Sequence, residues 1–358
     1  MKILVVNCGS SSIKYKLYSF PKQELLTKGL IERIGEKGSE VKTHKEGIRC
    51  LFSKLIENKA VKDLSEIDAI GHRVVHGAET FQKPHIIDNR VIKEIAKCCQ
   101  LAPLHNPANL EGIISCRKIL PKISQVAVFD TAFHQTIPQR AYLYAIPFYY
   151  YKKYKIRKYG FHGTSHQFVA HQAAKILKKP LQKLNLITCH LGNGCSITAI
   201  KNGLSIDTSM GFTPLEGLIM GTRCGDIDPA AIFYIMEKEK LTTNQMYDIL
   251  NKKSGLLGIS CLSNDFRILK KEQKSNIYAK LALDMFIYRI KKYIGAYMLI
   301  LGKVDAICFT AGIGENNPEI IFQIKQDIHK ILPKTKILVI PTDEELMIAK
   351  LTYQLIKE

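Results

Sequence analysis

The stretch ILVVNCGSSSIKYKLYSF, residues 3–20, decides how the chain begins to fold. Residues 3–6 are a short apolar run rich in β-branched side chains, residues 8–12 have the composition of a turn, and residues 13–20 resume as a strand. This order predicts a β-hairpin. The same plan recurs at residues 186–200, where two apolar runs flank the glycine-rich turn 192–194. The two hairpins indicate an internal duplication, and coincidence is the alternative because such hairpins are common.

Strand and helix signals alternate along the rest of the chain, which predicts an α/β fold. A length of 358 residues exceeds a usual single domain and favours about two domains. The 46% of hydrophobic residues exclude a disordered chain. No apolar run is long enough for a membrane span or a secretory signal, so we expect a cytoplasmic protein.

The cysteines and the net charge limit the function classes further. The ten cysteines include no C-x-x-C pair and no zinc-like spacing, which favours a reducing compartment without structural disulfides. The formal net charge of +20 fits anionic small substrates, nucleic acid or a lysine-rich surface. The densest basic run, residues 150–159, contains no recognisable nucleic-acid motif. We therefore expect neither a nucleic-acid nor a membrane partner.

Three segments rich in small residues could bind phosphate. Residues 7–12 (NCGSSS) offer backbone N–H groups and hydroxyls, and Lys14 adds a positive charge. Residues 190–194 (HLGNG) are a similar candidate. Residues 309–316 (FTAGIGEN) follow an apolar strand, so we expect a glycine-rich turn before a helix N-terminus. Taken alone, each segment is equally consistent with a plain turn.

Two pairs of histidines have a spacing of four residues: His72 with His76, and His162 with His166. A zinc-binding helix of the metalloprotease type needs glutamate after the first histidine, whereas these segments contain glycine and β-branched residues. Zinc is therefore not expected. We expect these histidines to bind or orient anions.

Three charged residues lie in apolar or glycine-rich surroundings. Arg73 and Arg223 are isolated arginines of the kind that faces anions or buried carboxylates. Asp130 follows the apolar run 126–129, at the strand end where α/β proteins place ligand groups. The alternative for Asp130 is a cap or turn carboxylate.

These segments belong to a larger set of motifs: NCGSSSIKYKLY, GHRVVHGAETF, LAPLHNPANLEGI, FDTAFHQTIP, YGFHGTSH, CHLGNGCSI, DTSMGFTPLEGLIMGTRCGDID, SGLLGIS, NDFR, FTAGIGEN and PTDEEL. In this order, and over nearly the whole chain, they closely resemble the motifs of acetate kinases. The resemblance implies the superfamily of acetate and sugar kinases, Hsp70 and actin. Its α/β fold has two duplicated ribonuclease-H-like lobes with an ATP cleft between them. One lobe would span residues 1–132 and recover the C-terminal helix 345–358, and the nucleotide-binding lobe would span residues 133–344.

The resemblance also implies a reaction, namely reversible phosphoryl transfer from ATP to acetate, which gives acetyl phosphate and ADP by direct in-line transfer. Asn7 and Glu344 would lie on the side of a Mg²⁺ ion, with Mn²⁺ as an alternative. Lys14, with Ser10 and Ser12, would lie against the ATP phosphates. The rest of the nucleotide site would comprise His190, Leu191, Gly192, Asn193, Gly194, Asp265, Phe266, Arg267, Gly312, Ile313, Gly314, Glu315 and Asn316. A homodimer is expected from the same resemblance.

The acceptor and the chemistry are assigned in the same way. Arg73 would bind the acetate carboxylate, and its methyl group would lie in a small apolar pocket formed by Val75, Leu104, Phe161 and Pro214. The catalytic positions would be Asp130, His162 and Arg223. A guanidinium and an imidazole can stabilise charge on the transferring phosphoryl group. Acetate is already ionised near neutral pH, so we interpret Asp130 as an orienting carboxylate, although in the family it is often described as an acid/base.

Two other functions stay open. A propionate kinase shares most of the motifs, and one methylene in such a pocket is worth only about 1 to 3 kcal/mol. A nucleotide-driven binding module could use the same fold, but it would not need Arg73 and Arg223 converging on an acceptor. Two departures from the family pattern are Cys8 and Cys224, which predict sensitivity to thiol reagents. The chain also looks shorter than typical members between residues 20 and 70 and between 320 and 342.

Overall fold

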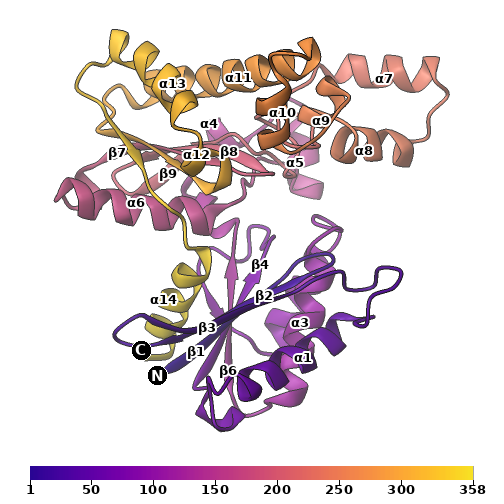
Figure 1. Ribbon diagram of the computed structural model, residues 1–358, viewed down its shortest axis with the longest axis vertical. Coiled ribbons are helices and arrows are strands. Elements are labelled where there is room, and N and C mark those ends of the chain that lie inside the picture. Colours follow the sequence, from indigo (N-terminus) through magenta and orange to yellow (C-terminus); the bar gives the residue numbers. More distant parts are fainter. Residues whose placement is uncertain (358) are drawn as a thin grey trace. The chain divides into compact units, whose positions relative to one another are not determined.

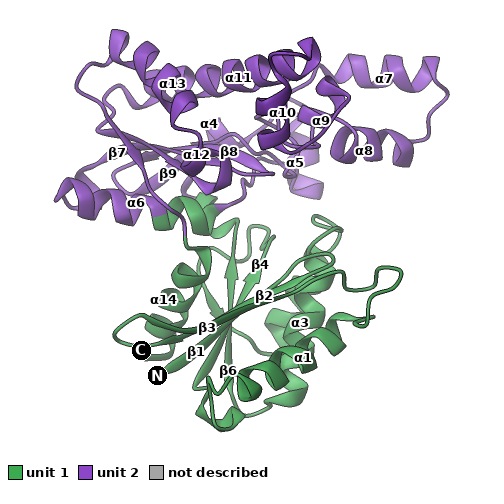
Figure 2. Cartoon of the chain, in the orientation of Figure 1, with its two compact units in different colours: residues 1–135, 163–168, 343–358 green, residues 136–162, 169–342 purple. Residues whose placement is uncertain are grey.

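The computed structural model describes residues 1–357, and the chain divides into two compact units (Figures 1 and 2). Unit 1 contains Met1–Gln135, Gly163–Phe168 and Asp343–Glu358, and unit 2 contains Thr136–His162 and Val169–Thr342. The sequence placed the boundaries after residues 132 and 344. It did not anticipate that Gly163–Phe168 groups with unit 1.

Unit 1 is built on a six-stranded sheet in the order β3-β2-β1-β4-β6-β5. The strands are β1 (Lys2–Cys8), β2 (Ile13–Ser19), β3 (Glu24–Ile31), β4 (Ala69–Val74), β5 (His85–Ile86) and β6 (Ser124–Phe129). β1 and β2 pair antiparallel, with Asn7 opposite Lys14 near the tip, which confirms the first predicted hairpin. β4 runs parallel to β1, and β6 runs parallel to β4.

Unit 2 repeats this plan in a five-stranded sheet in the order β11-β10-β7-β8-β9. The strands are β7 (Asn185–Leu191), β8 (Cys195–Lys201), β9 (Leu204–Thr208), β10 (Ala306–Thr310) and β11 (Lys336–Val339). The β7–β8–β9 meander is antiparallel, and β10 and β11 extend the other side of β7 in parallel. The order and directions match those of β3-β2-β1-β4-β6. The duplication that the two hairpins indicated is therefore present in the topology of both sheets.

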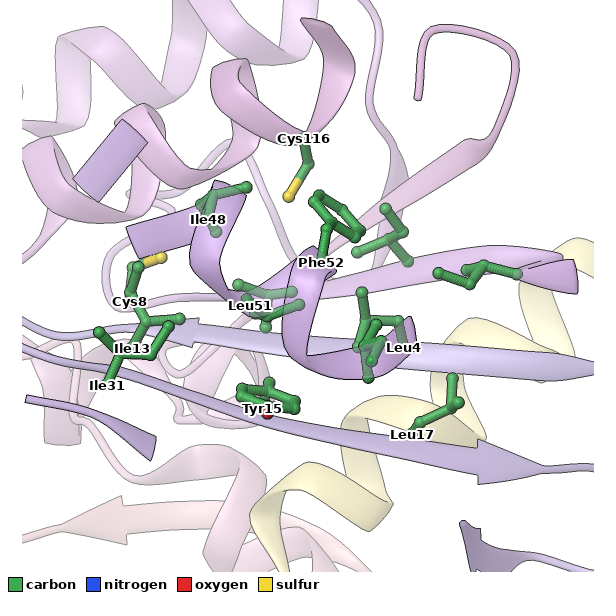
Figure 3. Packing of buried hydrophobic residues seen from close by; sticks show 14 of the residues in the cluster. Leu4, Cys8, Ile13, Tyr15, Leu17, Ile31, Ile48, Leu51, Phe52 and Cys116 are labelled. Atoms are coloured by element: carbon green, nitrogen blue, oxygen red, sulfur yellow. The ribbon is translucent and has the colours of Figure 1, made fainter. Parts of the chain in front are cut away.

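The helices of unit 1 cover both faces of its sheet. They are α1 (His44–Glu57), α2 (Asn89–Cys98), α3 (Asn106–Ile119) and α14 (Glu344–Lys357). Alternate residues of β1 point to opposite faces. Leu4 and Cys8 pack with residues of α1 and α3 in the core that Figure 3 shows, whereas Ile3 and Val5 pack against α14. Unit 1 is therefore completed by the last helix of the chain.

The helices of unit 2 lie between residues 139 and 331. They are α4 (Gln139–Tyr142), α5 (Phe148–Tyr154), α6 (Gly163–Leu177), α7 (Pro229–Lys238), α8 (Thr243–Lys252), α9 (Gly255–Ser260), α10 (Phe266–Glu272), α11 (Ile277–Leu301), α12 (Ala311–Asn316) and α13 (Pro318–Ile331). The first residues of α6 group with unit 1 and the rest with unit 2. Across residues 1–357, every helix is too short or too polar to span a membrane.

Candidate functional site

Arg73 and Asp130 meet at one edge of the unit 1 sheet. Arg73 lies near the end of β4, Asp130 directly follows β6, and parallel neighbours end at the same edge. Arg73 Nε donates to both oxygens of Asp130, at 3.2 and 3.1 Å, and Nη2 donates to Oδ2 at 2.6 Å. Burial lowers the pKa of Arg73, but the charges of Asp130 and Glu344 outweigh burial, so the net pKa is raised. This bidentate pair fixes the plane of the guanidinium.

The start of α6 closes over Asp130 within the same unit. The backbone N–H of Gly163 donates to Asp130 O at 3.0 Å, and the Thr164 hydroxyl donates to Asp130 Oδ1 at 3.3 Å. A Cβ atom on Gly163 would lie 2.1 Å from Asp130 O, so only glycine fits there. Asp130 is 1% exposed and is held from three sides.

Two further acidic residues of unit 1, Glu344 and Glu345, lie at the start of α14. Burial raises the pKa of Glu344, with Asp130 and Glu345 adding to the rise, while Arg73 and Lys14 oppose it. The Glu345 carboxylate accepts Lys14 Nζ at 3.0 Å and Lys16 Nζ at 3.2 Å. A nearby cation stabilises the charged form of a carboxylate, and this matters most where burial disfavours that form. Asn7 and Glu344 offer oxygen donors, which suit a Mg²⁺ ion that keeps several waters.

The hairpin tip of unit 1 carries the other predicted phosphate residues. Ser10 is exposed and Ser12 is half-buried, and Ser12 O accepts the Gly9 N–H at 2.8 Å. Lys14 stands across from Asn7 with a side chain that is 51% exposed. The tip is thus a turn with accessible hydroxyls beside a lysine.

The predicted pocket residues are divided between the units. Val75 directly follows β4 and is buried, and its N–H donates to Asn109 Oδ1 at 3.0 Å. Leu104 is 41% exposed, also in unit 1. Phe161 is buried and Pro214 is half-buried in unit 2. Neither unit by itself holds all four.

Unit 2 brings His162 and Arg223 to the tip of the second hairpin. His162 Nδ1 lies 3.0 Å from Ser196 Oγ, and its ring stacks on His190 with centroids 4.2 Å apart. A Cβ atom on Gly194 would lie 3.4 Å from His162 Cε1 and 3.5 Å from Arg223 Nη1. Both side chains therefore flank Gly194, which has none.

Arg223 differs from Arg73 in its electrostatics. Its Nη1 donates to Pro214 O at 3.1 Å and contacts Met220 Sδ at 3.7 Å. Burial lowers its pKa, and no carboxylate pairs with it within residues 1–357. A half-buried guanidinium without a counter-charge favours an incoming anion.

A cavity of about 1010 Å³ lies in unit 2, in the size range of small-molecule sites. The predicted nucleotide residues that line it are Gly192, Asn193, Asp265, Phe266, Arg267, Gly312, Ile313 and Asn316. The predicted residues that do not line it are His190, Leu191, Gly194, Gly314 and Glu315. Residues that sequence reasoning missed are Gly221, Asn264, Lys270, Lys271 and Asn317. A signal for the lysines was available, because they follow Arg267 by about one helical turn.

The wall of this cavity that α10 provides begins at Asp265. Asp265 caps α10 by accepting the Arg267 N–H, and Arg267 Nη2 donates to Asp265 Oδ2 at 2.6 Å. The side-chain hydrogen bond from Arg267 lowers the pKa of Asp265 to about 2. Asp265 therefore remains charged and keeps Arg267 at the cavity.

The segment 309–316 differs from its prediction. It forms no glycine-rich turn, since Gly312 and Gly314 lie within the short helix α12. Glu315 Oε1 accepts the N–H groups of Ala311 at 2.7 Å and Thr342 at 3.1 Å. The chain's own carboxylate thus occupies the place of the expected anion, and what faces the cavity is the side of the helix with Gly312, Ile313 and Asn316.

The histidine pairs also need a correction. His72 Nε2 lies 2.8 Å from Gln125 Oε1, and burial lowers the pKa of His72 to about 4. Burial lowers the pKa of His76 to about 3. Both are neutral core side chains near pH 7, so the expectation that they bind anions is wrong. His166 is also fully buried, whereas His162 is half-buried.

The thiol sensitivity expected from Cys8 and Cys224 is not supported either. Cys8 lies inside the core that Figure 3 shows, and burial raises its pKa to about 12. Burial also raises the pKa of the half-buried Cys224. Thiolates are the reactive form, and these environments disfavour them.

We therefore expect iodoacetamide at neutral pH to alkylate the exposed Cys261 rapidly and Cys8 only after unfolding. Peptide mass spectrometry of a labelling time course measures both rates in one sample. Equal rates for Cys8 and Cys261 in the folded protein would contradict the burial of Cys8.

Comparison with known proteins gives a consistent result. The model of the Acetokinase family matches residues 2–332. Acetate kinases of Thermoanaerobacter pseudethanolicus and Acetivibrio thermocellus are 52% and 51% identical over 100% of this chain, and the matches cover 99% and 100% of those proteins. The first alignment spans 398 positions, more than the 358 residues of this chain, in keeping with shortened stretches.

Solved structures agree over the same extent. The crystal structure of Porphyromonas gingivalis acetate kinase superposes with a TM-score of 0.94 at 42% identity, and it covers 99% of each chain. That of a propionate kinase from Francisella tularensis gives a TM-score of 0.91 at 44% identity, also over 99% of each chain. The chain therefore belongs to the acetokinase family.

Proposed function

We propose that this protein catalyses reversible phosphoryl transfer between ATP and acetate. Its family makes it a kinase; the acceptor, the metal and the mechanism are the proposal. In the forward direction an acetate oxygen forms a bond to the γ-phosphorus, and the bond from that phosphorus to the β–γ bridging oxygen breaks. The observation that carries the proposal is Arg223, a guanidinium without a counter-charge beside His162 in the unit that holds the cavity.

The cavity of unit 2 is the proposed site of ATP or ADP. Its walls combine apolar surfaces, Phe266 and Ile313, with the amide groups of Asn193 and Asn316. An apolar slot with a few polar groups is typical of nucleotide and other cofactor sites. Arg267 and the lysines of α10 add positive charge for phosphates.

Mg²⁺ is the proposed metal, with Mn²⁺ as the alternative ion. Asn7 and Glu344 would hold it, together with waters and phosphate oxygens. When bound, it supplies positive charge that neutralises the phosphate oxygens. Lys14, held by Glu345 at 3.0 Å, would add to this charge.

The acceptor carboxylate would bind Arg73. Asp130 uses Nε and Nη2 of the guanidinium, which leaves Nη1 to donate to an acetate oxygen. This geometry supports an orienting role for Asp130, because acetate has no proton to lose at neutral pH. Arg223 and His162 would stabilise the charge on the equatorial oxygens of the transferring phosphoryl group. This role suits direct in-line transfer, whose transition state is loose.

Propionate is the alternative acceptor, and Val75 offers a test of the pocket. We expect Val75→Ala to raise kcat/KM for propionate relative to acetate by about 10-fold or more, since one methylene is worth about 10 to 200-fold. The measurement is kcat/KM for both acids with both proteins. Val74, the buried neighbour on β4, gives the matched control Val74→Ala, which should leave the ratio unchanged. An unchanged ratio in Val75→Ala would remove Val75 from the pocket.

We further propose a cytoplasmic homodimer. The ten unpaired cysteines suit a reducing compartment. Helices α7 and α11 carry large apolar side chains that are strongly exposed in the single chain, among them Phe233 at 69%, Ile277 at 76% and Leu299 at 86%. Exposed apolar surface of this kind supports association with a second copy.

The test of the function is an assay of the purified chain with ATP, Mg²⁺ and acetate, propionate or butyrate in turn. Trapping the acyl phosphate with hydroxylamine identifies the product directly. We expect acetyl phosphate and ADP in equal amounts, and no product without the divalent ion. ATP binding without acyl phosphate from any of the three acids would instead support a nucleotide-driven binding module.

A further inference from the structure

The connection between β9 and α7, residues 209–228, carries both Pro214 and Arg223 but contains no helix or strand. Connections of this length without regular structure are uncommon in compact domains and are usually functional. A catalytic side chain on such a segment needs something else to fix it. The contacts of Asp226 are among those that fix this segment.

Asp226 closes residues 217–226 into a ring. The Gly217 N–H donates to Asp226 Oδ1 at 2.8 Å, and the Asp226 N–H donates to Gly217 O at 3.0 Å. A Cβ atom on Gly225, which has φ +71°, would lie 2.5 Å from Gly217 O and Leu218 O. The two ends of the ring are so close that a side chain at Gly225 would prevent closure.

The same carboxylate anchors the ring to α11. Tyr293 OH donates to Asp226 Oδ2 at 2.8 Å, and Arg289 Nη1 lies 3.0 Å from the same oxygen. Arg289 and Tyr293 are four residues apart, so they lie on one face of the helix. The ring is thereby tied to the longest helix of unit 2.

Arg223 lies inside this ring. Its backbone oxygen accepts the Met220 N–H at 3.1 Å, and its Nη1 donates to Pro214 O. The residues beside Arg223 are also held from outside the ring, since the Gly221 N–H donates to Asn193 O at 3.0 Å and the Cys224 N–H donates to Leu250 O at 3.1 Å. Within the described residues no carboxylate pairs with the guanidinium, so these backbone contacts and the closed ring together set its position.

We propose that Asp226 is a positioning residue that holds Arg223 in place for phosphoryl transfer, by closing the ring and anchoring it to Arg289 and Tyr293. The inference rests on the proposed role of Arg223. Asp226 is 40% exposed, and ion pairs of exposed groups contribute little to stability. Its loss should therefore change geometry much more than folding.

The first experiment compares Asp226→Asn with Asp228→Asn. The amide keeps the shape of Asp226, but its NH₂ group cannot accept a hydrogen bond from Arg289 or Tyr293. Asp228 only caps α7 through the Ala230 N–H at 2.9 Å, and asparagine caps equally well. We expect Asp226→Asn to lower kcat by about 10- to 100-fold, as small misplacements of catalytic groups do. Asp228→Asn should match the wild type, and ATP affinity should be unchanged in both.

The second experiment is a double-mutant cycle with Arg223→Ala. If Asp226 acts through Arg223, Asp226→Asn should lower kcat by no more than about twofold in the Arg223→Ala background. An equal loss in both backgrounds would overturn the proposal, because Asp226 would then act elsewhere. Full turnover of Asp226→Asn in the wild-type background would overturn it as well.

Hydrogen exchange gives a readout that does not depend on activity. Amides of residues 217–226 should exchange faster in Asp226→Asn than in Asp228→Asn, and equal exchange would disprove the closed ring. If the wild type forms no acyl phosphate, the proposed function fails, and exchange still decides whether Asp226 closes the ring.

If Asp226→Asn does not fold, Tyr293→Phe removes one anchor from the helix side. It should lower kcat severalfold, and unchanged turnover would then reject the proposal.

Discussion

Replacing Arg223 by alanine is expected to reduce kcat by about 10³-fold or more, as loss of a phosphoryl-stabilising arginine does elsewhere. In the proposed mechanism its guanidinium acts on charge that develops in the transition state, so its loss lowers kcat more than it raises KM. Within residues 1–357 no carboxylate pairs with its guanidinium, which donates to Pro214 O and contacts Met220 Sδ, so its removal leaves no buried charge unpaired. Thermal stability should therefore stay close to that of the wild type.

The measurement is steady-state kinetics beside a direct ATP-binding titration. Arg267→Ala is a matched control, because Arg267 lines the cavity and should affect ATP affinity more than turnover. Arg223→Lys is not expected to recover full activity, since lysine lacks the planar fork that holds two oxygens. A folded Arg223→Ala protein with most of its turnover would show that Arg223 has no transition-state role.

Replacing Arg73 by alanine should have two effects, in contrast to Arg223. The apparent affinity for acetate should fall with a smaller loss of turnover, because binding the carboxylate is common to ground and transition states. Stability should also fall, because Asp130 is 1% exposed and would lose its bidentate partner. Breaking a buried pair in this way costs about 3 to 5 kcal/mol.

A second substitution separates the two effects. In the Arg73→Ala background, Asp130→Asn removes the unpaired charge and should restore part of the free energy of unfolding without restoring the KM for acetate. Urea unfolding and acetate kinetics on the single and double variants give both quantities. An Arg73→Ala protein as stable as the wild type would contradict the structural importance of the pair.

Much of the architecture could be predicted because local sequence patterns determine its strands and turns. Apolar runs on either side of turns rich in small residues predicted both hairpins, and the strand order that β3-β2-β1-β4-β6 shares with the sheet of unit 2 follows the duplication that they indicated. The position of Asp130 after β6 likewise followed from the apolar run before it. These features depend on neighbours in the sequence, so one sequence is enough to find them.

The wrong predictions concern the burial of side chains, which cannot be inferred from the neighbouring residues in the sequence. His72 and His76 have the spacing of ligands, but the packing of unit 1 makes them neutral core residues. Cys8 is next to Asn7 in the chain, yet alternation in β1 turns its side chain into the core. In segment 309–316, Glu315 lies four residues after Ala311 and takes the free N–H that an anion was expected to take.

The ring that Asp226 closes could not be predicted from the sequence either. Its partners Arg289 and Tyr293 are far along the chain and look like ordinary polar positions of a long helix. Only the folded unit 2 brings them to one carboxylate. The lysines that line the cavity could have been proposed from their distance to Arg267, but no motif marked them.

The place of α14 in unit 1 has a consequence for biosynthesis. Unit 2 is complete once Thr342 has been made, whereas unit 1 still lacks its last helix. Until then the face of the sheet that carries Ile3, Val5 and Val126 lacks Ile348 and Ala349, which pack on it. Domains generally mature in the order of translation. Unit 1 starts to be synthesised before unit 2 but is completed after it, so a nascent chain exposes an apolar face of the unit 1 sheet until α14 has been made.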